Sequence, residues 1–167
     1  MARNLGTIVL LFFALVLQVT VVNRLGFPVT PDLVLLVVIA LATLRGPLGG
    51  AVIGFLTGLA ADLAPPADHV LGQYALVMCV TGYLAGRWAN RVPMLSVAVC
   101  AAGAPALAVG VGSLLGDPGV DWNTFVSLWP GAALCNLLAA PIVVWIVHRL
   151  YRPARRRDVV VVGRRRW

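Results

Sequence analysis

The residues of this chain that could do chemistry are few, and their spacing does not assemble a catalytic set. Among 167 residues the acids are six aspartates, and there are two histidines, three cysteines and no lysine. Cys79, Cys100 and Cys135 stand singly inside apolar stretches, without the paired spacing that zinc and redox motifs require. His69 and His148 have no second ligand at metal-binding spacing. No nucleophile has a plausible base. We therefore predict no metal, no cofactor and no enzymatic activity.

One carboxylate, Asp62, follows a row of glycines spaced four residues apart, at Gly46, Gly50, Gly54 and Gly58. On an α-helix such residues lie on nearly the same face. In lipid, small residues at this spacing allow a second helix to approach closely, because packing drives association there. We therefore predict a helix-packing or partner interface along the row. Asp62 at its outer end is either a cap, or structural hydrogen bond, or a contact for a partner.

The next apolar segment carries a second small-residue face, at Gly82 and Gly86. Several amides and one tyrosine also fall within or beside apolar segments. Interhelical hydrogen bonding is the simpler account of these polar residues, and lining a small cavity is the alternative. They are Gln18, Asn23, Gln73, Tyr74 and Asn136.

The elements that position these residues are expected to be apolar helices. The chain is 60% hydrophobic and 11% charged, whereas a soluble domain carries about 25% charged residues. We predict an all-α integral membrane protein with six transmembrane helices, over residues 5–22, 32–44, 48–63, 71–89, 94–115 and 124–150. The second segment as a helix is only about 20 Å long, short of the roughly 30 Å hydrocarbon core. It is a short span, or it pairs with the third segment as a re-entrant unit across Arg45-Gly46-Pro47.

The arginines predict the orientation of the helices. With six spans and a cytoplasmic N-terminus, twelve of the thirteen arginines fall inside and only Arg24 falls outside, a strong positive-inside pattern. Both termini are then cytoplasmic. We expect residues 1–151 to form the membrane domain and residues 152–167 to form a disordered cytoplasmic tail. The tail's arginine triplets are predicted anchors for topology or anionic lipid rather than nucleic acid: Arg155, Arg156, Arg157, Arg164, Arg165 and Arg166.

A longer pattern contains the glycine row. A Pro-Asp opening leads to an Arg-Gly-x-x-x-Gly step, then to a Gly-Phe-x-x-Gly-x-x-x-Asp helix, and a further glycine follows the next loop. In this pattern the chain resembles the family of the rod shape-determining protein MreD. The matching residues are Pro31, Asp32, Arg45, Gly46, Gly50, Gly54, Phe55, Gly58, Asp62 and Gly72.

The resemblance implies a non-catalytic subunit of the bacterial cell-elongation complex, located in the cytoplasmic (inner) membrane. Such a subunit binds an MreC-like protein and helps to organise peptidoglycan synthesis and cell shape, together with a RodA-type glycosyltransferase and a class B penicillin-binding transpeptidase. It also implies a fold similar to the S components of ECF vitamin transporters. The alternative function is therefore a substrate-binding S component, whose cavity would be lined by groups such as Gln18, Gln73 and Tyr74.

Overall fold

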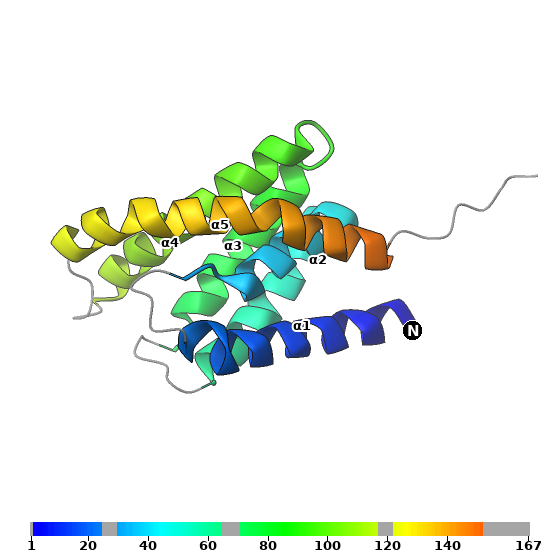
Figure 1. The fold of residues 1–167 in the computed structure, drawn as a ribbon, viewed down its shortest axis with the longest axis horizontal. Helices are drawn as coiled ribbons and strands as arrows, with labels where there is room; N and C mark the ends of the chain where they lie inside the picture. Colours follow the sequence, from blue (N-terminus) through cyan, green and yellow to red (C-terminus); the bar gives the residue numbers. More distant parts are fainter. Residues whose placement is uncertain (1, 25–29, 65–70, 117–121, 152–167) are drawn as a thin grey trace, which may run out of the picture.

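The computed structural model describes residues 2–24, 30–64, 71–116 and 122–151, and the regular structure within these ranges is helical. Its elements are α1 (Ala2–Thr20), a short 3-10 helix η1 (Val22–Arg24), α2 (Leu33–Asp62), α3 (Gln73–Trp88), α4 (Pro93–Leu115) and α5 (Trp122–Tyr151). In Figure 1, α2 and α3 lie between α1 on one side and α5 on the other.

The described chain has five α-helices rather than the six predicted. The second and third predicted segments are joined in α2, in which Gly46 alone leaves helical geometry, with φ 79° and ψ −177°. Glycine tolerates this conformation because it has no Cβ, and Pro47 follows in the position where a new helical segment accepts proline. The break predicted between Arg45 and Pro47 is therefore present, but as a kink inside one element.

Three of the described helices are long and apolar enough to cross a membrane: Leu33–Asp62, Pro93–Leu115 and Phe125–Tyr151. The apolar part of α1, Asn4–Thr20, is shorter, and α3 has only 16 residues. The chain is thus an all-helical protein with the apolar helices of a membrane protein, although the structure does not support six separate spans.

The kink at Gly46 bends α2 sharply. A Cβ added to Gly50 would lie 2.7 Å from the Cβ of Ala42, although eight residues of straight helix would separate the two by about 12 Å. The helix therefore consists of two arms that meet at Gly46. The first arm covers residues 33–45 and the second arm covers residues 47–62.

The first arm forms the centre of the fold. All nine residues from Val34 to Ala42 are buried, and α2 contacts each of the other four α-helices. A helix that is apolar on every side is expected to be enclosed in this way. The second segment predicted from the sequence, the short one, is thus covered by protein.

The outer surface of the described helices is strongly apolar. Phe12 in α1 is 68% exposed, and Leu138 in α5 is 66% exposed. Exposed apolar faces of this extent mark contact with a membrane or with other proteins, which agrees with the apolar composition of the chain.

We predict that Gly46→Ala lowers the free energy of unfolding by about 1–3 kcal/mol, the cost of a non-glycine residue in a sparsely populated backbone region. No atom lies within 4 Å of the position that the new Cβ would take, so backbone strain would be the cause. The measurement is thermal unfolding in detergent. Gly103→Ala in α4 is the matched control, since it also has open space but ordinary helical geometry. Equal unfolding temperatures for the two variants would contradict the prediction.

Candidate functional site

The glycine row of the second arm lies directly against α3. A Cβ added to Gly50 would collide with the backbone oxygen of Gly82, and one added to Gly82 would collide with the oxygen of Gly50. A Cβ added to Gly54 would collide with the backbone of Met78 in the same way. The backbones of the two helices are therefore in contact at positions where no side chain fits.

The contact between the two helices continues at both ends of the row. A Cβ on Gly58 would lie 2.5 Å from the Cα of Ala75, and one on Gly86 would lie 2.5 Å from the carbonyl carbon of Gly46. The two small-residue faces of the sequence analysis are thus brought together, with Gly86 near Gly46 and Gly82 against Gly50. α2 and α3 form the most extensive helix pair of the structure.

Asp62 is buried where the glycine row ends. One of its carboxylate oxygens accepts hydrogen bonds from the backbone N–H groups of Gly72, at 2.9 Å, and Ala75, at 3.1 Å. The other oxygen accepts from the N–H group of Tyr74, at 3.3 Å. These N–H groups lie at the first turn of α3, where no helical partner is available to them. The last residue of α2 therefore caps α3.

The backbone around Gly72 makes this cap possible. Gly72 has φ 90°, a conformation that favours glycine, and it turns the chain so that three backbone donors reach one carboxylate. The negative charge also complements the positive end of the α3 dipole. Of the two roles expected for Asp62, the geometry is that of a structural cap.

A second set of hydrogen bonds holds the start of α2. Gln18, near the end of α1, accepts a hydrogen bond from the N–H group of Leu33 at 2.8 Å, and its amide nitrogen donates to the Pro31 oxygen at 3.4 Å. One side chain of α1 thus binds a donor and an acceptor on either side of Asp32, the residue just before α2.

Asn136 binds the same point from α5. Its side-chain oxygen accepts from the N–H group of Asp32 at 2.8 Å, and its nitrogen donates to the Ala101 oxygen of α4 at 3.2 Å. Asn136 is 2% exposed, so both bonds are made away from solvent. The start of α2 is therefore tied to α1, α4 and α5 by two amide side chains.

Asp32 lies just before the first residue of α2 and caps it, since its carboxylate accepts from the N–H group of Leu35 at 2.9 Å. Removal from water raises the pKa of Asp32 to about 6, against the opposing effect of hydrogen bonds from the backbones of Leu35 and Val34. In its ionised form the carboxylate complements the positive end of the α2 dipole.

The kink is surrounded by a third polar group, which we call the Gly46 corner: Thr43, Arg45 and Gly46 with their partners Asn4, Thr7 and His148. The Arg45 guanidinium donates to the side-chain oxygens of Asn4, at 3.0 Å, and Thr7, at 2.6 Å. The Thr43 hydroxyl lies 2.9 Å from His148 Nε2. The corner therefore joins the beginning of α1 and the end of α5 to the kink.

The sequence-predicted polar residues fall into two classes. Gln18, Gln73 and Asn136 make interhelical hydrogen bonds, which confirms the simpler of the two accounts for these three residues; Gln73 donates to the Ala108 oxygen at 3.2 Å. Tyr74 is partly buried and packs against the apolar core. None of the three lines the groove described below. The side chain of Asn23, the loop residue His69 and the arginine triplets of residues 152–167 lie outside the part that the structure describes.

The contacts of the Gly46 corner were missed by the sequence analysis. Arg45 was assigned only to topology, and His148 had no partner in the sequence. The one available signal was the position of Thr43 and Arg45 beside the predicted break. Within the described ranges there is no group of three residues that could hold a metal ion. Asp32, Asp62, Gln18 and Asn136 hold the ends of α2 and α3 in place.

A protein-family model matches residues 2–153 of the chain. The matching model is described as MreD, rod shape-determining protein MreD. No curated protein and no solved structure matches the chain, so the expected likeness to transporter S components gains no support.

We predict that Asp62→Ala lowers the free energy of unfolding by about 2 kcal/mol, because three N–H groups at the start of α3 lose a charged acceptor. Asp62→Asn, which keeps one carbonyl oxygen, should lose less. The measurement is thermal unfolding in detergent. The control is Ser113→Ala, since the exposed Ser113 hydroxyl bonds only within its own helix, to the Val109 oxygen. An unchanged unfolding temperature for Asp62→Ala would exclude the capping role.

Asn136→Leu is expected to lower the free energy of unfolding by about 2–3 kcal/mol. The new side chain has the same branched arrangement of heavy atoms, but it cannot form hydrogen bonds and leaves the N–H group of Asp32 and the oxygen of Ala101 without partners. Leu138→Ala is the control on the exposed side of the same helix. Because the start of α2 would be released, hydrogen exchange at residues 33–36 should accelerate in Asn136→Leu. Protection equal to that of the unmodified chain would contradict the prediction.

Proposed function

This chain belongs to the MreD family of rod shape-determining proteins, and from that premise we propose that it is a non-catalytic membrane subunit of the bacterial cell-elongation complex. In this role it binds an MreC-like protein. Through that protein it helps to position a RodA-type glycosyltransferase and a class B penicillin-binding transpeptidase for peptidoglycan synthesis. The family match over residues 2–153 is the observation that carries the proposal.

The use of the polar side chains supports a binding role rather than a catalytic one. Asp62, Gln18 and Asn136 each have their side-chain groups bound to the backbone of a neighbouring segment. Groups held in this way fix the relative positions of helices and are not free to exchange protons with a substrate. A rigid arrangement of helices is what a protein needs in order to present constant surfaces to several partners.

We further propose that the chain lies in the bacterial inner membrane with its Gly46 corner toward the cytoplasm. Arg45 lies at the corner and Arg87 follows the glycine that contacts it, whereas Asp32 and Asp62 lie at the far ends of the two arms. This separation of charge supports a positive-inside orientation.

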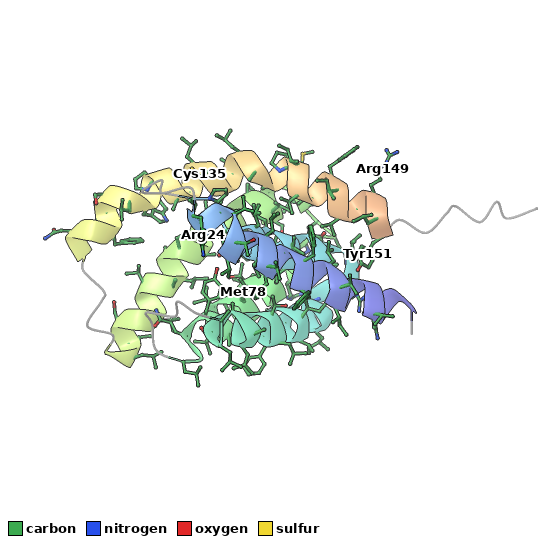
Figure 2. The ribbon with its side chains drawn as sticks, turned by 60° about the horizontal axis from the view of Figure 1, so that its bottom comes forward. Arg24, Met78, Cys135, Arg149 and Tyr151 are labelled. Atoms are coloured by element: carbon green, nitrogen blue, oxygen red, sulfur yellow. The ribbon has the colours of Figure 1, made fainter. Side chains whose placement is uncertain are left out.

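The two ends of the described chain also lie close together, which supports a common side of the membrane. A Cβ on Gly6 would lie 3.4 Å from the hydroxyl of Tyr151. In Figure 1 the beginning of α1 and the end of α5 lie on the same side of the molecule. Figure 2 shows Tyr151 toward α1, with Arg24 far from both Tyr151 and Arg149. Six full crossings are not required for this placement.

In this proposal the glycine row, with Gly82 and Gly86, is a helix-packing seam within the subunit, and Asp62 closes its far end. A leucine at Gly54 or Gly58 would displace α3, so loss of partner binding in such variants would report the loss of the fold. Apolar outer faces of the described helices remain exposed and are available to partners, with Phe12 of α1, Leu48 of α2 and Leu138 of α5 among their residues.

The proposal predicts two results in a bacterium whose own copy has been depleted. Expression of this chain should restore rod shape, and affinity purification of the tagged chain should recover the MreC-like protein at a level well above that of an unrelated polytopic membrane protein carrying the same tag. Asp62→Ala should reduce shape and recovery together in proportion to its loss of folded protein. Depleted cells that stay rod-shaped, or full rescue without recovery of the MreC-like protein, would reject the proposed role.

A further inference from the structure

An open groove with a volume of about 520 Å³ lies between three segments: the first arm of α2, the first half of α4 and the second half of α5. Met94 and Ala98 line it from α4, and Leu137 and Val144 line it from α5. The small side chain of Ala140 on the α5 wall leaves room that a larger residue would fill. The volume is in the range of small-molecule sites, about 300–1,000 Å³.

The groove is apolar along its length and polar at one end. At that end Thr43 and His148 contribute to the lining and are joined by their 2.9 Å hydrogen bond. This is the end of the groove at the Gly46 corner. A ligand that fills the groove must therefore be apolar for most of its length and polar where it reaches the corner.

Two exposed arginines adjoin residues that line the groove. Arg149 follows His148, and its guanidinium lies 5.4 Å from the centroid of the Trp145 ring, which also lines the groove. Arg91 is exposed in the turn two residues before Pro93, where the α4 wall begins. Asp32 and Asp62, the acids within the described ranges, are bound at helix ends elsewhere. The charge at this end therefore favours an anionic group.

We propose that the groove binds an acyl chain of an anionic glycerophospholipid, whose phosphate group is held by Arg149 and Arg91. The acyl chain supplies the apolar length that the groove requires, and the phosphate supplies the negative charge at its polar end. An arginine whose planar guanidinium is held against an indole ring is positioned to bind a phosphate group. The lipid completes the surface between α4 and α5, and it does so independently of the proposed function.

The test is native mass spectrometry of the full chain, released from nanodiscs that contain equal amounts of phosphatidylglycerol and phosphatidylcholine. We expect one phosphatidylglycerol to remain bound, in at least tenfold preference to phosphatidylcholine. Arg149→Gln should lower retention of phosphatidylglycerol about fivefold, the effect expected for one basic residue near an anionic surface, and leave phosphatidylcholine unchanged. Arg24→Gln is the matched control, since Arg24 lies far from Arg149 (Figure 2).

A second variant tests the groove itself. Leu137→Trp should fill the groove and remove retention of both lipids. An unchanged unfolding temperature of this variant would show that its helices remain packed. If Leu137→Trp does not fold, Arg149→Gln still decides the test, since the Arg149 side chain is exposed. Equal retention of the two lipids, or an Arg149→Gln variant that behaves like Arg24→Gln, would overturn the proposal. It would equally be overturned by a dimer that carries no lipid and dissociates in Leu137→Trp, because a second copy would then occupy the groove.

Discussion

The close contact of the α2 and α3 backbones is the interaction on which the rest of the structure depends. In lipid the hydrophobic effect does not drive two helices together, so their association depends on close packing. At Gly50, Gly54 and Gly58 the backbone of α3 occupies the space that a Cβ would take. The same glycines would weaken a helix in water by about 1 kcal/mol each relative to alanine. These glycines are therefore explained by the close approach of α3 that they allow.

The polar side chains provide hydrogen-bond partners for backbone groups that this packing leaves without one. A bent element such as α2 has ends and a kink within an apolar molecule, and unpaired backbone groups there would be costly. Asp62 satisfies the first turn of α3, and Gln18 and Asn136 bind the start of α2. The kink itself is held by Arg45. These polar residues thus lie where helical hydrogen bonding stops, which accounts for their positions.

Local features of this fold could be predicted from the sequence, but contacts between distant segments could not. The spacing of the glycines can be read directly from the sequence, and the predicted break at Arg45–Pro47 is present as the kink at Gly46. Each of these features depends on a few neighbouring residues. The bonds of Asn136 to Asp32 and of His148 to Thr43 join residues 104 and 105 positions apart, and no pattern along the chain specifies such pairs. The count of six separate helices is not supported for a related reason: the second and third predicted segments are joined at Gly46 within α2, and hydropathy does not show how such segments are joined.

The way in which the polar side chains are used also limits where a partner can be recognised. Asp62, Gln18 and Asn136 are engaged by backbone groups at helix ends, and the backbones of α2 and α3 are in contact along the glycine row. A partner in the membrane must therefore recognise the shape of an outer apolar face or the charge at one end. The outer faces of α1 and α5 are convex helix surfaces, whereas the groove between α4 and α5 is concave and ends beside Arg149. Shape and charge coincide there, so this end of the molecule can discriminate between ligands that the convex faces would treat alike.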